Sequence, residues 1–528
     1  MRHGRWATSL ALISLMAAAE ARGQHAPRPA RSASYHHAYR TYYSQPETPS
    51  SPSDAPIEAE PDSVLAPPAP PGDANVIAPP PASAHGGNGF IYDSCDPPCV
   101  HGCYNGSACP PACTGCSSCC GDSSTDCCTS ACEDEGDGVW RLFGDVELLP
   151  GDPCGCRKPL SIFIGGWIQG GITGNGDGNR SSQGNYPVPF NQVSDGFVFN
   201  QAPYIYAEKV ADTGGAGFDW GARVDYVFGT DGPDTQAFGD EGWDFGWNSS
   251  RDYASAIPQL YIDLAYNNVS LRVGHFYTII GYEVVPAIGN FFYSHALTMN
   301  YGEPFTHTGA LTTYKPNDNW TFYNGYTFGW DSGFDNHADA HTYLGGVSYA
   351  WEDIATFTWA VNTGRFGDGE GLPHGGGAAD GYIYMNSFVA SINLTDNIEY
   401  VFQHDSASNW NIPGAESAQW YGINQYLFIT LSDMVKFGAR VEWFKDEDGA
   451  RIGAHPFADP AAVALGPTEG DYFQYTIGLN ITPHPNVVIR PELRWDKFEG
   501  DAPAGALPFD NGNEDDLFTA GVDAILQF

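Results

Sequence analysis

The sequence predicts an all-β protein that crosses a membrane as an antiparallel up-and-down β-barrel of about 16 strands. Three observations predict this fold: short segments of alternating polarity fill residues 159–528, their connections are alternately short and long, and the last segment is an amphipathic strand that ends on Phe528. Membrane barrels join their strands by short turns at one rim and long loops at the other. A hairpin of residues 290–300 in the wall would raise the count to 18 strands.

Residues 1–21 are expected to be a secretory signal peptide, because Arg2 and Arg5 precede an apolar run and Ala19-Glu20-Ala21 offers a cleavage site. Residues 22–90, rich in Pro, Ala and Ser, are expected to be a disordered spacer. No later stretch approaches the roughly 18 to 20 uninterrupted apolar residues that a transmembrane helix needs. We therefore expect export, and entry into a bacterial outer membrane only as a barrel.

Residues 91–158 are expected to form a cysteine-rich periplasmic segment, since all 13 cysteines fall within it. The oxidising periplasm favours disulfides, although CTGCSSCC (113–120) also has the C-x-x-C spacing of a metal site. The odd total leaves one thiol that could link the segment to a neighbouring protein or to the cell wall. The disulfide candidates are Cys95, Cys99, Cys103, Cys109, Cys113, Cys116, Cys119, Cys120, Cys127, Cys128, Cys132, Cys154 and Cys156.

The barrel segment, 159–528, contains sixteen expected strands. They are 160–174, 196–209, 217–228, 256–266, 268–277, 307–315, 318–329, 341–351, 353–363, 382–393, 396–405, 418–431, 434–445, 471–482, 485–496 and 516–528. Short turns such as Asn267-Asn268 and Ser432-Asp433 alternate with long connections such as 229–255 and 278–306. An even number of strands returns both ends of the barrel to the periplasm.

Side chains within these strands alternate between a lipid face and a lumen face. The expected lumen side chains of 434–445 and 485–496 include Arg440, Glu442, Arg490, Glu492, Arg494 and Asp496. In the last strand Phe518, Val522 and Leu526 would face lipid, and Asp523 the lumen, at a position where outer-membrane barrels often have glycine. Tyr and Trp near strand ends, among them Trp220, Trp330 and Trp495, would form interfacial girdles.

Residues 160–528 resemble the β-barrel porin-2 (OmpL-like) family of outer-membrane proteins. The resemblance rests on Pro258-Gln259-Leu260-Tyr261-Ile262, LRVGHFYTIIGYE (271–283), NFFYSHALTMNYGEPFTHTGALTTY (290–314) and ITPHPNVVIRPELRWD (481–496). It implies a passive channel and does not specify a solute. The residues before 160 lie outside it.

The connection 278–306 is unusually apolar for an external loop, and it carries Glu283 and Glu303. We expect it to fold into the lumen and to narrow the pore. Its acids would face wall arginines from the set Arg223, Arg272, Arg440, Arg490 and Arg494. Such a pairing would create a transverse field that orients polar solutes, although internal salt bridges that merely hold the loop would use the same residues.

Charge and motifs narrow the function further. The chain has 63 Asp and Glu against 23 Lys and Arg, which argues against nucleic acid and anionic membrane surfaces as partners and predicts a mild cation preference. No HExxH, GxSxG or phosphate-binding loop occurs, so we expect no enzyme and no cofactor, with a hydrolase using scattered residues such as His307 and Asp405 as an open alternative. The acidic stretches 174–179 and 445–449 could bind Ca²⁺ or Mg²⁺, or simply be solvated loops.

The function predicted from these observations is passive diffusion of small hydrophilic solutes or ions through an outer-membrane pore. Its partners would be outer-membrane lipid and the solutes, and a homotrimer is compatible with the prediction. One alternative is a structural or adhesive barrel with a plugged lumen, anchored through the cysteine-rich segment. Another is a secreted, soluble β-sandwich that binds carbohydrate.

Overall fold

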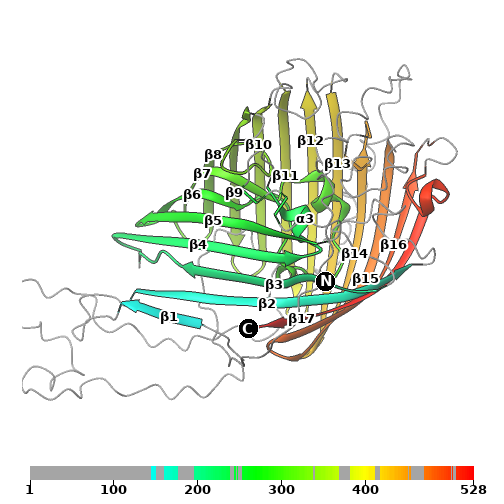
Figure 1. The fold of residues 1–528 in the computed structure, drawn as a ribbon, viewed down its shortest axis with the longest axis horizontal. Helices are drawn as coiled ribbons and strands as arrows, with labels where there is room; N and C mark the ends of the chain where they lie inside the picture. Colours follow the sequence, from blue (N-terminus) through cyan, green and yellow to red (C-terminus); the bar gives the residue numbers. More distant parts are fainter. Residues whose placement is uncertain are drawn as a thin grey trace, which may run out of the picture.

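The computed structural model describes the barrel and one short strand that precedes it (Figure 1). The described residues are 144–149, 160–175, 196–213, 215–237, 243–244, 246–247, 253–336, 339–367, 381–410, 417–449, 451–452, 469–500, 502 and 507–528. The expected signal peptide (1–21), the spacer (22–90) and all 13 cysteines lie outside them. No helix within the described ranges has the length and hydrophobicity needed to cross a membrane.

Sixteen antiparallel strands, β2 to β17, close into one barrel, which confirms the predicted fold class. Each strand pairs with the next, and β17 returns to β2, where Leu526 lies opposite Ile168. This closure rules out the soluble β-sandwich. The strands are β2 (Leu160–Asn175), β3 (Phe197–Lys209), β4 (Phe218–Gly229), β5 (Ala254–Tyr266), β6 (Val269–Tyr277), β7 (Thr306–Tyr314), β8 (Trp320–Thr327), β9 (His341–Trp351), β10 (Ala355–Gly367), β11 (Gly381–Thr395), β12 (Ile398–Trp410), β13 (Ser417–Ser432), β14 (Val435–Asp446), β15 (Gly470–His484), β16 (Val487–Glu499) and β17 (Asp516–Gln527).

The connections alternate as the sequence predicts. Two residues join β5 to β6 and β11 to β12, and the tight turns use left-handed residues such as Asn267 (φ 53°) and Glu352 (φ 50°). The opposite rim carries the long connections, one of which includes the short helix α3 (Gly232–Thr235). The barrel therefore has one rim of tight turns and one of long loops.

The option of 18 strands is wrong. Residues 290–300 do not form a hairpin in the wall but belong to the connection between β6 and β7, which also contains the short helices η2 (Ala287–Gly289) and η3 (Thr298–Gly302). We call residues 278–305 the inner loop, because hydrogen bonds join it to inward-facing side chains of the barrel.

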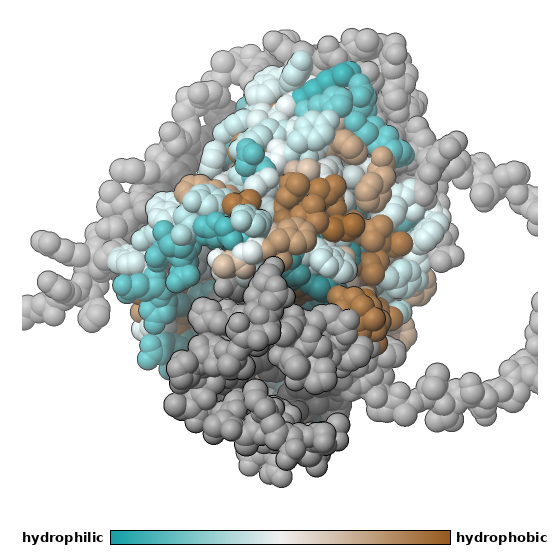
Figure 2. Space-filling model, turned by 90° about the vertical axis from the view of Figure 1, so that its left-hand side faces the viewer, coloured by the Kyte–Doolittle hydropathy of each residue, from teal (hydrophilic) through white to brown (hydrophobic). Residues whose placement is uncertain are grey.

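The two faces of the wall separate as predicted. On β14, Val441 is exposed while Arg440 and Glu442 are buried, and on β16 Leu493 is exposed while Arg494 is buried. The outward side chains form the apolar surface that faces lipid, seen as brown side chains gathered on one face of the molecule in Figure 2. Most of the aromatic residues assigned to the girdles are exposed, but Trp330 is buried inside against Trp420.

A strand that the sequence does not predict lies within the segment 91–158. This strand, β1 (Gly144–Leu149), pairs with the start of β2, and Gly144 lies opposite Ile164. The C-terminal residue Phe528 exchanges backbone hydrogen bonds with Gly166 two positions further along β2. Both β1 and β17 run antiparallel to β2 and pair with successive parts of it. Strand β1 therefore occupies the place beside β2 that β17 would take if it ran on past Phe528.

Gly166 is required by this seam, since a Cβ at Gly166 would stand 2.3 Å from the carbonyl oxygen of Tyr204 and 3.0 Å from the ring of Phe528. We expect Gly166→Ala to lower the folded fraction, because overpacking costs about 1–3 kcal/mol. Gly174→Ala in the same strand is the control, since a Cβ there meets no atom within 4 Å. Gel mobility without heating measures the folded fraction, and equal loss in both variants would contradict the expectation.

Candidate functional site: the inner loop and the wall that holds it

The inner loop is almost entirely buried inside the barrel. Its apolar side chains Phe292, Leu297, Met299 and Tyr301 are each at most 4% exposed. Leu297 and Tyr301 belong to a cluster with Trp420 of the wall and Phe292 to a cluster with Phe428, whereas Met299 packs with Val285 and Ala296 of the loop itself. An aromatic-rich connection can be buried here because the barrel interior supplies the apolar surface that bulk solvent would not.

Strand β14 holds the middle of the inner loop with one acid and one base. The Glu442 carboxylate accepts hydrogen bonds from the N–H groups of Leu297 (2.8 Å) and Thr298 (2.6 Å). Arg440 Nη1 donates to the carbonyl of Ser294 (2.8 Å) and to Glu283 Oε1 (2.6 Å). Both side chains point inward because they occupy alternate positions of the strand.

Strand β16 holds the adjoining part of the loop in the same manner. The Glu492 carboxylate accepts from the N–H groups of Tyr293 (3.0 Å) and Ser294 (3.1 Å). Arg494 Nη1 donates to the carbonyl of His295 (2.7 Å), and Arg490 Nη1 to that of Ala287 (2.9 Å). The polar side chains of β14 and β16 therefore bind mainly the backbone of the loop.

Glu283 is the predicted loop acid that meets a wall arginine. Besides Arg440, its carboxylate accepts from the N–H of Ala296 (2.8 Å) and the hydroxyl of Tyr426 (3.1 Å), and His295 lies 3.5 Å away. Burial by itself would raise the pKa of Glu283, but Arg440 and His295 outweigh it and lower the pKa to about 2. The carboxylate is therefore charged across the ordinary pH range.

A pH dependence follows from Glu283. Its pKa in the folded protein, about 2, lies below the ordinary value of 4.5, so its stabilising effect is complete above about pH 4.5 and is lost as the pH falls toward 2. We expect the conductance of single channels to become noisier over that acidic window as the loop loosens. Glu283→Gln is expected to remove this part of the pH dependence, and a variant with the unchanged profile would contradict the assignment.

Glu303, the second predicted loop acid, does not meet an arginine. Gln403 and Asp405 of β12 are its polar neighbours, and Gln403 Nε2 donates to its Oε1. Burial and the adjacent Asp405 raise the pKa of Glu303 well above its usual range.

The other four predicted arginines all pair with carboxylates of the wall. Arg490 holds Asp523 with Nε at 2.9 Å, and Arg494 holds Asp496 with Nε at 2.7 Å. The remaining contacts are Arg223 Nε to Asp225 Oδ1 at 2.7 Å, Arg223 Nη1 to Glu208 Oε2 at 2.8 Å and Arg272 Nη2 to Asp263 Oδ2 at 2.8 Å. The carboxylate partners of Arg223 and Arg272 thus lie on strands β3 to β5 and not on the inner loop. Of the five predicted arginines only Arg440 binds a predicted loop acid.

The structure adds Glu442, Glu492 and Asp523 to the residues predicted to matter. Alternation in the sequence already indicates that all three face inward. Their partners, which are backbone N–H groups of the inner loop or an arginine on the next strand, leave no trace in local sequence. Asp523 also accepts from Gln169 Nε2 of β2 (2.8 Å), so it links β16, β17 and β2 where the barrel closes.

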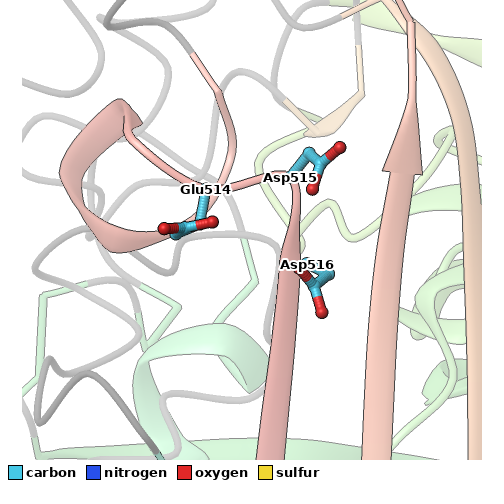
Figure 3. A group of neighbouring side chains, drawn as sticks. All are labelled: Glu514, Asp515 and Asp516. Atoms are coloured by element: carbon cyan, nitrogen blue, oxygen red, sulfur yellow. The ribbon is translucent and has the colours of Figure 1, made fainter.

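The acidic stretches considered for Ca²⁺ or Mg²⁺ differ in what the structure describes. In 445–449, Asp446 accepts from the N–H groups of Arg451 (2.7 Å) and Ile452 (2.8 Å). Most of 174–179 lies outside the described residues. Another group, Glu514, Asp515 and Asp516, brings three carboxylates within 4.8 Å of one another (Figure 3). Lys497 pairs with Asp515 (2.6 Å) and the indole of Trp495 donates to Asp516 (2.8 Å), so neighbouring side chains already engage two of the three.

Three solved porin-like structures resemble the fold. An anion-selective porin from Comamonas acidovorans has a TM-score of 0.47 at 9% identity and covers 70% of this chain and 99% of its own. The trimer form of OmpT, an outer membrane protein of Vibrio cholerae, scores 0.44 at 10% identity, covering 70% and 99%. The outer membrane channel DcaP of Acinetobacter baumannii scores 0.43 at 11% identity, covering 70% and 97%.

The family comparison covers the whole barrel. No curated protein matches the chain. The family model described as "Putative beta-barrel porin-2, OmpL-like" matches residues 161–528, from the start of β2 to the last residue. This match confirms the resemblance predicted from the sequence, and the chain belongs to this family of outer-membrane β-barrel porins.

Proposed function

We propose that the protein lets small hydrophilic solutes and ions diffuse passively across the outer membrane, and that the inner loop sets the width of its pore. The observation that carries the proposal is the attachment of the loop backbone to β14 and β16 by Glu442, Glu492 and three arginines. Carboxylates and guanidinium groups that bind main-chain atoms fix a constriction in place. The proposal includes no catalytic activity and no cofactor, in keeping with the lack of catalytic sequence motifs.

A mild preference for cations is part of the proposal. The five wall arginines predicted from the sequence are all paired with carboxylates in direct contact. Glu442 and Glu492 are held instead by N–H groups of the inner loop, so their charges add to those of the pairs. An interior with more acids than bases attracts cations and repels anions.

The first test is the conductance of detergent-extracted protein in a planar bilayer with a salt gradient across it. We expect stable steps and a reversal potential that favours cations. The Glu492→Gln variant should favour cations less than the parent protein does, because it removes one negative charge from the interior. Its amide oxygen can still accept hydrogen bonds from the loop N–H groups. A reversal potential that favours anions would contradict the proposed cation preference but would still agree with an open channel.

A structural barrel with a filled lumen is the competing function. The observation that favours it is a large apolar cluster inside the barrel, which includes Trp330, Trp420, Phe444, Tyr472 and Phe498. Strand β1 would then serve to tie the N-terminal region to the wall. Folded, membrane-extracted protein that gives no conductance steps would favour this function over the channel.

The remaining features of the proposal concern export and assembly. Residues 1–21 would direct export, and the cysteine-rich segment would lie in the periplasm and form disulfides within itself or with a neighbouring protein.

A homotrimer would bury an apolar hollow of about 510 Å³ on the outer wall, lined by Ile162, Trp220, Val224, Leu260, Ile262 and Val273 among others. Light scattering of the detergent-purified protein measures the oligomer, and Val224→Lys should weaken it.

A further inference from the structure

Two carboxylates meet inside the barrel where the inner loop returns to the wall. Glu303 comes three residues before β7, and Asp405 faces inward from β12. They are 4% and 1% exposed. One amide group, Gln403 Nε2, donates to Oε1 of Glu303 and, at 3.1 Å, to Oδ2 of Asp405, so both carboxylates lie around a single donor.

This pair has no basic partner in the described part of the chain. Arg440, the arginine that binds the other acid of the inner loop, is paired with Glu283 at 2.6 Å. The other titratable neighbours are Glu283 itself, a further acid, and His404, which lies on the opposite face of β12 from Asp405. Two buried carboxylates side by side repel each other and cannot both stay ionised without a positive charge close by.

Unpaired polar atoms surround the same place. Ser387 of β11 lies directly opposite Asp405, and Asn424 of β13 lies opposite Gln403. Ser387 interacts with the Asp405 carboxylate, whereas among the described residues both side-chain polar atoms of Asn424 have no hydrogen-bond partner. Buried polar atoms of native proteins are nearly always satisfied, so the unpartnered amide of Asn424 beside two acids indicates a ligand that the protein chain itself does not supply.

We propose that Glu303 and Asp405, with Ser387 and Asn424, bind one Ca²⁺ ion inside the barrel. Two carboxylates match its double charge, and carboxylate, hydroxyl and amide oxygens are its preferred ligands, in a set loose enough for Ca²⁺ rather than the strict octahedron of Mg²⁺. Gln403 would orient the two carboxylates, because its Nε2 donates to Glu303 Oε1 and to Asp405 Oδ2 and leaves one oxygen of each acid for the ion. The ion would fasten the end of the inner loop to β11–β13.

Gly281 fits this assignment. Its φ of 86° is left-handed, and a Cβ there would stand 1.9 Å from Glu303 Oε2. The bare backbone of Gly281 therefore leaves the space that the Glu303 carboxylate occupies. A side chain at this position would push the Glu303 carboxylate out of its place.

The test measures Ca²⁺ binding to folded, detergent-solubilised protein after treatment with EDTA, by calorimetry and by thermal unfolding. We expect one tight Ca²⁺ per chain and a rise in Tm on addition of Ca²⁺. Asp405→Asn and Glu303→Gln should weaken that binding more than about tenfold, as ligand-shell changes do. In EDTA both variants should be at least as stable as the parent protein, because each removes the repulsion between the carboxylates, and this separates lost binding from misfolding.

The acidic group of Figure 3, which is exposed at Glu514 and half-buried at Asp515 and Asp516, supplies the matched control. A variant with Glu514→Gln, Asp515→Asn and Asp516→Asn should keep the tight site and its Tm rise. The proposal is overturned if this variant loses the site, or if Asp405→Asn retains it. It is also overturned if the parent protein binds no Ca²⁺ and Glu303→Gln changes only the pH dependence of Tm, since the acids would then share a proton instead.

Discussion

Replacement of Arg440 by methionine is expected to raise the single-channel conductance and to destabilise the protein by about 3–5 kcal/mol, as loss of one partner from a buried ion pair does. Arg440 is 0% exposed and reaches both Glu283 and the carbonyl of Ser294. Without it, Glu283 stays buried with its charge uncompensated, and the middle of the inner loop loses one of its two polar links to β14, the other being Glu442. Conductance in planar bilayers and denaturant titration of the folded barrel measure the two effects.

Arg272→Met is the matched control for this prediction. Arg272 is also a buried, inward arginine, but its partner is Asp263 on the neighbouring strand β5 rather than the inner loop. It should lower stability without widening the pore. The double variant Arg440→Met/Glu283→Gln should recover much of the stability, because no unpaired charge remains, and should keep the raised conductance. Equal conductance changes in Arg272→Met and Arg440→Met would contradict the assignment.

Asp523→Gly is expected to be the most damaging change in the last strand, although glycine is common at this position in other outer-membrane barrels. In this chain the Asp523 carboxylate holds Arg490 with contacts of 2.9 and 2.5 Å, and both side chains are buried. Its removal leaves a guanidinium group inside the barrel at the closing strand, at a cost of about 3–5 kcal/mol. The folded fraction on unheated gels should fall accordingly.

A second substitution decides the reason for that loss. If the unpaired Arg490 is the cause, Asp523→Gly/Arg490→Met should restore much of the folded fraction. Asp523→Asn should lie between the parent and Asp523→Gly, since an amide oxygen can still accept one bond from Arg490. Failure of the double variant to recover would mean that Asp523 acts through Gln169 of β2 instead.

Strand positions could be predicted from the sequence because polarity alternates along nearly every strand. The expected strand 434–445 is β14 (Val435–Asp446), and 471–482 is β15 (Gly470–His484). A lipid face that excludes charge and a wet or polar interior that accepts it enforce this pattern residue by residue. Even Pro491 is accommodated within β16, where it pairs with Val522 of β17.

The contacts of the site could not be predicted in the same way. An inward acid such as Glu492 has the same local pattern whether it meets an arginine, a solute or the backbone of a loop. Its actual partner, the N–H of Tyr293, lies 199 residues earlier in the chain. Strand β1 was missed for a related reason, since six residues next to a cysteine-rich segment pair only with the start of β2.

The attachment of the inner loop has a consequence for the order in which the molecule is assembled. The loop is synthesised well before the strands that hold it, and its bonds to β14 and β16 span 144 to 203 residues. Contacts between such distant parts of a chain form late in folding. A nascent or truncated barrel without its last four strands would therefore carry a loop that lacks its hydrogen bonds to β14 and β16, and only a completed chain would have a pore of defined width.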